Sequence, residues 1–198
     1  MVAIDKAQNK AYSGGMEKIN LQISPNFTLA EFNQRRLNAH YWAMPLASLL
    51  HVVQKLRERI GSPVKITDGA RTVEAHIELY KKLHGDAWQD KITWNSKHLC
   101  AWDDPLVVYE GLPYKALCAV DVKCRNDGVD FEKNVDKSVD NLWITGGRMA
   151  SIVHEVVKSK SFNELFPDCF WGVGVGKNFI HLDTGPRRQA DAVWAYDY

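Results

Sequence analysis

The sequence has almost no net charge, because its 25 Lys and Arg residues are balanced by 24 Asp and Glu residues. It also lacks a basic stripe, which argues against recognition of nucleic acid through its phosphates. No apolar stretch approaches the roughly 20 residues that span a bilayer, and residues 1–18 lack the apolar segment of a secretory signal. We therefore expect a protein made in the cytoplasm without a signal peptide, with no nucleic-acid partner and no membrane partner.

Cysteine is scarce, and no two cysteines have the CxxC spacing of a structural zinc cluster. This favours reduced, mostly buried thiols at Cys100, Cys118, Cys124 and Cys169. The chain of 198 residues, 45% of them hydrophobic, is long enough for one domain with its own core. Residues 1–22 are polar and predict a flexible N-terminal arm, and residues 23–198 predict a single domain, expected to be a monomer.

Helical periodicity predominates early in the chain and strand patterns predominate later. Thr28 and Glu31 have the spacing of a capping box, which predicts a helix that begins there. Apolar residues at three- and four-residue spacing predict longer helices. The pattern favours an α+β fold, a small mixed or antiparallel sheet flanked by helices. The expected helices are 28–37, 45–60, 73–84 and 147–160, and the expected strands are 63–67, 119–123, 170–175 and 179–184.

The last of these strands alternates polar and apolar residues. Side chains two residues apart share a face of a strand, so Phe179, His181 and Asp183 point one way. Ile180 and Leu182 point the other way, into a core. A histidine and a carboxylate on one face form half of a metal site or half of an acid–base pair.

Two other segments offer matching groups. Asp121 lies on the strand face opposite to its apolar neighbours, and His98 lies in the irregular segment 86–117. Two histidines and a carboxylate suit a catalytic zinc with an open fourth position. In a chain with seven histidines, most are nevertheless ordinary core or surface residues.

Four segments, taken in order, resemble the zinc D-alanyl-D-alanine carboxypeptidase superfamily, in particular its phage and bacterial subgroup. This superfamily includes D-Ala-D-Ala dipeptidases, phage L-alanyl-D-glutamate endolysins and proteins with the Hedgehog signalling domain fold. The segments are 26–32, 63–71, the Ser-x-His and Ala-x-Asp motifs at 96–98 and 119–121, and 172–187.

The resemblance implies a site. His98, Asp121 and His181 would bind one Zn²⁺ per chain, and Ser96 would steady the loop that carries His98. Arg71 would hold a substrate carboxylate or the developing oxyanion. The implied fold is Hedgehog/DD-peptidase-like.

The implied activity is a metallopeptidase that cleaves peptidoglycan stem peptides containing D-amino acids, as a carboxypeptidase or an endopeptidase. The substrate partner would be the stem peptide. Without a signal peptide, such a protein fits a phage endolysin released during host lysis, or a component of the phage virion.

The sequence departs from the family in the length of one loop. Twenty-two residues separate His98 from Asp121, where relatives have few. This predicts an inserted loop at about 99–118, which is either a lid over the site or a variable surface loop. Cys100 and Cys118 flank the base of this loop and could meet there, although a cytosolic chain disfavours a disulfide.

The expected general base is also missing. Relatives carry a glutamate, aspartate or histidine two or three residues before the last ligand, where this chain has Phe179 and Asn178. Asp183 is a candidate for the catalytic base, or it orients a neighbouring side chain. Other candidates are Asp103, Asp104, Glu110 and Glu155.

Three alternatives follow. The first is a weak or inactive peptidase-fold module that binds cell wall or serves as a phage structural component. The second is a non-haem iron oxygenase, ranked lower because no histidine follows His181. The third is an α+β interaction domain without a metal, for which the four motif matches would be accidental.

Overall fold

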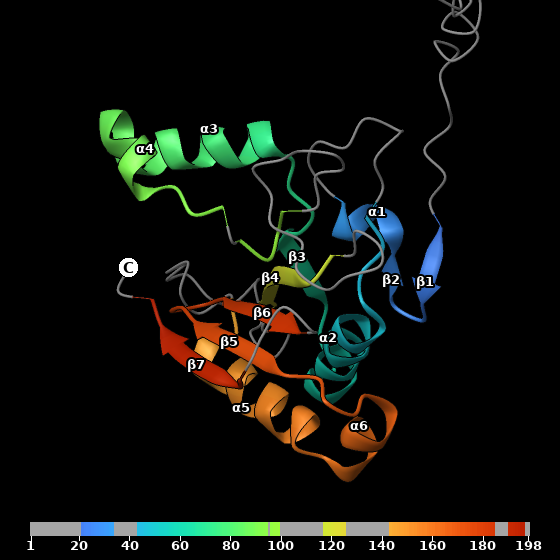
Figure 1. Cartoon of the computed structure of the whole chain (residues 1–198). Coiled ribbons are helices and arrows are strands. Elements are labelled where there is room, and N and C mark those ends of the chain that lie inside the picture. The colour runs from blue at the N-terminus through green and yellow to red at the C-terminus, as the bar shows by residue number, and fades with distance from the viewer. Residues whose placement is uncertain are drawn as a thin grey trace, which may run out of the picture.

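A five-stranded mixed sheet forms the middle layer of the protein (Figure 1). The computed structural model describes residues 21–33, 43–94, 96–99, 117–125, 143–184 and 190–196. The strand order across the sheet is β3-β4-β6-β5-β7. These strands are β3 (Val64–Asp68), β4 (Ala119–Cys124), β5 (Trp171–Val175), β6 (Ile180–Thr184) and β7 (Ala192–Ala195).

Pairing in the sheet is antiparallel except at one edge. β4 pairs antiparallel with both β3 and β6, and β6 pairs antiparallel with β5. β7 runs parallel to β5 and completes that edge. The predicted α+β class with a small mixed sheet is confirmed. β7 was not predicted from the sequence; among the described strands it pairs with β5 alone.

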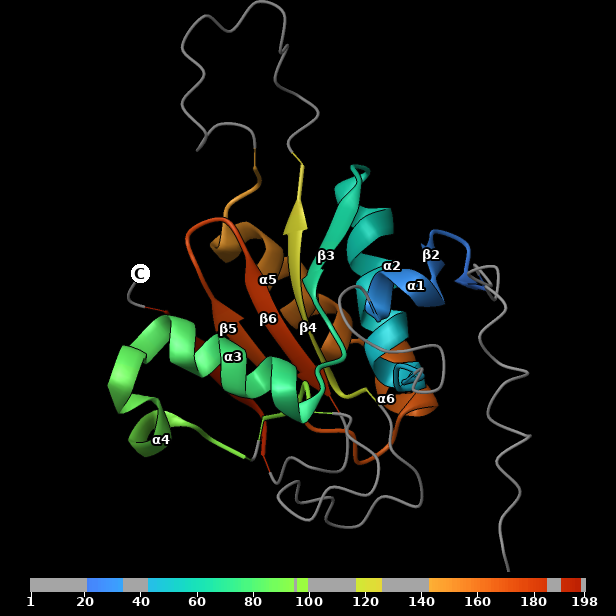
Figure 2. The same ribbon diagram turned by 90° about the horizontal axis from the view of Figure 1, so that it is seen from above.

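Helices lie on both sides of the sheet. α2 (Ala47–Ile60), α5 (Gly146–Val157) and α6 (Lys160–Leu165) lie on one side, as Figures 1 and 2 show. α3 (Val73–His84) and α4 (Trp88–Lys91) lie on the other. A single 3-10 turn, Gly85–Ala87, joins these two helices.

A smaller unit lies beside the β3 edge (Figure 2). It consists of the two-stranded antiparallel sheet β1 (Gln22–Ser24) and β2 (Phe27–Thr28), followed by α1 (Leu29–Phe32). The Glu31 carboxylate accepts a hydrogen bond from the backbone N–H of Thr28 at 2.7 Å, so the predicted capping-box contact is present. The Phe32 carbonyl accepts one from Ala70 N, which attaches α1 to the turn after β3.

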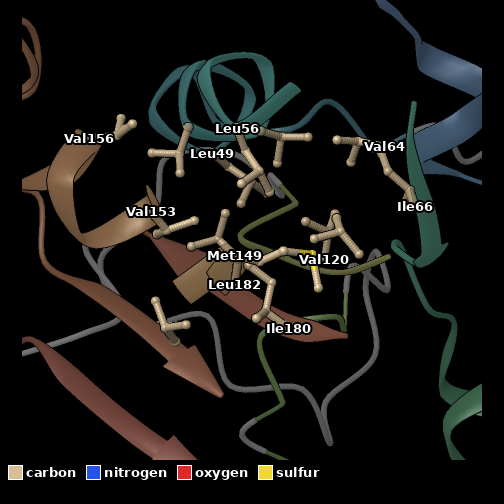
Figure 3. Close-up of a cluster of buried hydrophobic side chains, with 14 of the residues drawn as sticks. Leu49, Leu56, Val64, Ile66, Val120, Met149, Val153, Val156, Ile180 and Leu182 are labelled. Atoms are coloured by element: carbon tan, nitrogen blue, oxygen red, sulfur yellow. The ribbon is translucent and has the colours of Figure 1, made fainter. Parts of the chain in front are cut away.

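The core fills the space between the sheet and helices α2 and α5 (Figure 3). Leu49 and Met149, from the two helices, are fully buried, as are Ile180 and Leu182 from β6. The predicted inward direction of the β6 side chains is therefore confirmed. Because alternate residues of a strand point to opposite faces, Asp121 of β4 and His181 and Asp183 of β6 are directed to the side of α3.

Two of the predicted helices end where the sequence indicated. α2 ends just before Gly61, which has a φ of 74°, and α3 ends just before Gly85, which has a φ of 54°. Glycine is favoured at both positions because it adopts positive φ without a steric penalty. Pro45 lies just outside α2, where it pairs with Leu117 in an isolated bridge.

The predicted helix 147–160 is wrong in one respect, because the structure contains two helices there. α5 ends at Val157, and the Ser159 hydroxyl accepts a hydrogen bond from Phe162 N at 3.2 Å, which caps the start of α6. Serine at an N-cap satisfies an amide that has no partner within the helix.

Several predictions lie outside the described residues. These are most of the N-terminal arm and most of the inserted loop with Cys100. The predicted first helix, 28–37, is shorter in the structure, because α1 ends at Phe32 with Asn33 as its C-cap, and residues 34–37 lie outside the described residues. Cys118, at the other end of that loop, is buried. Among the described helices, none is long and apolar enough to cross a membrane.

Candidate metal centre

Three segments deliver the predicted ligands to one place on the α3 side of the sheet. Asp121 of β4 lies directly opposite His181 of β6 in the antiparallel register. Adjacent strands in this register bring side chains on the same face into contact. His98 comes from residues 96–99, which follow α4 along the chain. The structure therefore brings together all three residues.

Their nitrogen and oxygen atoms converge. Nδ1 of His181 lies 2.8 Å from Oδ1 of Asp121 and 3.1 Å from Nε2 of His98. Nε2 of His98 lies 3.5 Å from the same Asp121 oxygen. Each residue offers one ligand atom, and the three lie close enough together to hold a single metal ion.

The two rings are oriented by acceptors on their far sides. Nδ1 of His98 lies 2.9 Å from the carbonyl oxygen of Gly69, and Nε2 of His181 lies 3.2 Å from Oδ2 of Asp183. A carbonyl and an ionised carboxylate only accept, so these two nitrogens carry the protons. When each ring is neutral, its opposite nitrogen directs a lone pair toward the centre of the group. Metal-binding histidines commonly have this arrangement.

The charges of the site favour a cation. With both imidazoles neutral, the carboxylates of Asp121 and Asp183 place two negative charges beside them, and Asp183 is only 2% exposed. Buried charge is costly unless it is compensated. A divalent ion would cancel both charges.

A proton competes for the same place. Burial lowers the pKa of His181, but its hydrogen bonds with Asp121 and Asp183 outweigh burial and raise that pKa to about 9. Burial likewise raises the pKa of Asp121, yet the charge of His98 and the hydrogen bond with His181 hold it well below its usual range. The site therefore holds an ionised carboxylate against a ring that binds either a proton or a metal ion.

Arg71 lies beside this group through its backbone. Its N–H donates to the His98 carbonyl at 2.9 Å. Its guanidinium is engaged elsewhere, because it donates to the Asp68 carboxylate and lies 3.1 Å from Nδ1 of His76. These two contacts use two of the five N–H groups of an arginine. The proposed contact with substrate stays a prediction.

Ser96 and Asp183 also occupy positions next to the ligands. The Ser96 carbonyl accepts from Leu99 N at 3.2 Å, closing a turn that contains His98, and the predicted role of its hydroxyl remains a prediction. The contact of Asp183 with His181 supplies the orienting role that the sequence left open. A catalytic role for Asp183 stays a prediction.

Aromatic residues that were not predicted from the sequence border the site. The Trp194 ring, from β7, lies 5.5 Å from the His181 ring, and Tyr196 lies 5.4 Å from Phe179. Gly174 of β5 makes room for them, since a Cβ there would come within 2.5 Å of the Tyr196 ring and 2.7 Å of the Trp194 ring nitrogen. The parallel pairing of β7 with β5 sets Trp194 opposite Gly174 and so places these rings beside the site.

One candidate for the general base is excluded by its place in the fold. Glu155 lies on α5, across the sheet from the ligands, and forms a 2.6 Å ion pair with Arg59 of α2. The candidates Asp103, Asp104 and Glu110 lie outside the described residues.

Comparisons of the chain with protein-family models, with curated proteins and with solved structures found no match.

Proposed function

We propose that this protein is a zinc-dependent peptidase that cleaves peptidoglycan stem peptides containing D-amino acids. The observation that carries the proposal is the convergence of His98, Asp121 and His181, with the second nitrogen of each ring bound to an acceptor. The resemblance of the surrounding motifs to the D-alanyl-D-alanine carboxypeptidase superfamily supplies the reaction and the substrate class. It also suggests the Hedgehog/DD-peptidase-like form of the α+β fold.

The donor set and its spacing suit zinc. Tetrahedral zinc binds nitrogen and carboxylate oxygen at roughly 2.0–2.2 Å, so its ligand atoms lie roughly 3.3–3.6 Å apart. The present separations of 2.8, 3.1 and 3.5 Å need only small side-chain movements to reach that range. Three protein ligands would leave the fourth position for water or substrate, as in catalytic zinc sites.

The residues around the zinc would have different roles in the reaction. A bound zinc would polarise the scissile carbonyl and lower the pKa of a water toward ~7. Asp183 and Gly69 would hold the ligand rings in their tautomers. Arg71 would bind a substrate carboxylate or the oxyanion with N–H groups that Asp68 and His76 do not use.

The experiment combines metal analysis with digestion. The purified protein should contain about one zinc per chain, and its zinc-loaded form should release fragments from purified muropeptides that mass spectrometry identifies. His98→Ala should lose both properties, whereas His84→Ala should keep both, because His84 is exposed at the end of α3. Less than about a tenth of a zinc per chain in the wild type would rule out the zinc centre. Bound iron in place of zinc would favour the alternative of a non-haem iron oxygenase.

A second candidate is a peptidase-fold module that binds cell wall, or serves in a phage particle, without cleavage. Phe179 and Asn178 favour it, since neither accepts a proton where relatives have a base, and the Phe179 ring packs against Tyr196. Loss of a positioned base costs on the order of 10²–10⁴ in rate. Intact muropeptides after incubation with a high concentration of zinc-loaded protein would favour this module.

A further inference from the structure

His76 is a fully buried histidine outside the ligand set. It lies on α3 with 0% of its surface exposed. Its ring is flanked by the rings of Tyr80, at 4.8 Å, and Trp94, at 5.9 Å. These contacts fix the plane of the imidazole without accounting for its two nitrogens.

Both nitrogens of His76 have polar partners. Nδ1 lies 3.1 Å from Nη1 of Arg71, and Nε2 lies 2.8 Å from the carbonyl oxygen of Thr93. A guanidinium only donates and a carbonyl only accepts, so Nδ1 accepts and Nε2 donates. His76 is therefore neutral, in a single tautomer. Consistent with this, burial and the charge of Arg71 lower its pKa, although the bond with Thr93 raises it.

The two partners of His76 lead to the metal ligand His98 by separate routes. Arg71 N–H donates to the His98 carbonyl, and Arg71 also pairs with Leu99 in an isolated parallel bridge. Thr93 lies five residues before His98 along the chain. The segment that carries this ligand is thus attached to His76 at two points. Thr93 contacts His76 directly, and His98 is connected to it through Arg71.

We propose that His76 is a positioning residue for the metal centre, which holds Arg71 and Thr93 so that His98 presents Nε2 to Asp121 and His181. A metal ligand on an irregular segment needs external anchors, because among the described residues only an isolated bridge, and no strand ladder like that of β4 and β6, supports the segment of His98. The proposal rests on the zinc centre proposed above and is independent of peptidase activity.

Two substitutions separate hydrogen bonding from packing. His76→Leu removes both the acceptor and the donor. His76→Gln retains them on neighbouring atoms, since the amide oxygen accepts and the amide nitrogen donates. We expect His76→Leu to weaken zinc binding about 10–100-fold, and His76→Gln to restore most of that loss. His84→Leu, an exposed histidine on the same helix, is the matched control and should bind zinc like the wild type.

Zinc affinity is measured by competition with a chromogenic chelator, and the folded state of each variant by circular dichroism. A wild type that binds no zinc would reject the metal centre itself. A wild type that binds zinc, together with a folded His76→Leu that binds it equally well, would overturn the role of His76 alone. Loss of affinity in His76→Gln as large as in His76→Leu would also overturn the proposal, because packing and not the hydrogen bonds to Arg71 and Thr93 would then be responsible.

Amide hydrogen exchange gives a readout that requires neither zinc nor activity. In the metal-free wild type, the Arg71 amide should exchange slowly, because it donates to the His98 carbonyl. His76→Leu should accelerate this exchange, and His76→Gln should not. Fast exchange of the Arg71 amide in the wild type would overturn the proposal even if His76→Leu failed to fold.

Discussion

The carboxylate of Asp183 lies against Nε2 of His181, where it determines which nitrogen keeps its proton in the neutral, metal-binding form of the ring. It is almost completely buried, so its negative charge acts on the ring with little screening by solvent. Nδ1 of the same ring faces Asp121. At the scale of single residues, Asp183 is thus coupled to the metal centre through one imidazole.

Replacing Asp183 with Asn keeps an oxygen that can accept from His181 but removes the charge. We expect Asp183→Asn to bind one zinc per chain with about 10–100-fold lower affinity, measured by chelator competition. Asp168→Asn is the matched control, because Asp168 is exposed and asparagine tolerates its φ of 60°. Full turnover of muropeptides by Asp183→Asn would exclude Asp183 as the catalytic base, and unchanged affinity would contradict the orienting role.

The sequence was sufficient to name the three ligands but not their supports. His98, Asp121 and His181 were named from the resemblance of their motifs to a zinc peptidase family, and strand alternation predicted the face away from the core only for Asp121 and His181. His76 and Trp194 carry no such signal. Their importance depends on Thr93, Arg71 and the pairing of β7, which are fixed only by the tertiary structure.

At the scale of elements, the turn after β3 connects the metal centre to the small N-terminal unit. Gly69 offers its carbonyl to His98 on one side. On its other side it approaches Phe32 so closely that a Cβ at Gly69 would lie 2.1 Å from the Phe32 carbonyl oxygen. That oxygen accepts from Ala70 N, so the turn has little freedom to move.

Gly69→Ala should therefore weaken both the fold and the site. We expect a loss of about 1–3 kcal/mol in the free energy of unfolding, as for other overpacked positions, together with weaker zinc binding, because the turn must shift away from α1. Urea unfolding and chelator competition measure the two effects. Gly147→Ala is the control: a Cβ there meets nothing within 4 Å, so it should be neutral or stabilising by up to about 1 kcal/mol. Wild-type behaviour of Gly69→Ala would contradict this account of the turn.

Helices with a sustained hydrophobic period were predicted well. Boundaries that depend on a single local contact were not. The predicted range of α3 is correct, and α2 begins two residues later than predicted because Pro45 pairs with Leu117. The break between α5 and α6 depends on a single hydroxyl, that of Ser159. β7 requires a partner strand that already exists, so no local pattern identifies it.

At the scale of the whole molecule, the metal centre connects the two strands at the middle of the sheet to the segment that follows α4. An ion that binds only the folded protein stabilises it by RT ln(1 + [L]/Kd), about 2.7 kcal/mol at a hundredfold excess over Kd. Zinc should therefore raise the unfolding temperature of the entire domain. The rise should depend on pH, since zinc must displace a proton from His181.

The direction of this pH dependence follows from the His181 pKa. Its folded value of about 9 exceeds the ordinary value of 6.5, so protonation stabilises the zinc-free protein fully below pH 6.5 and progressively less up to pH 9. Zinc affinity should change in the opposite sense, rising about tenfold per pH unit from pH 6 to 8 as the competing proton becomes less available.

Differential scanning calorimetry should show that the unfolding temperature with zinc exceeds that with EDTA by an amount that widens over this pH range. His98→Ala should show no such difference. A difference that stays constant or narrows with pH would mean that zinc does not replace a proton on His181.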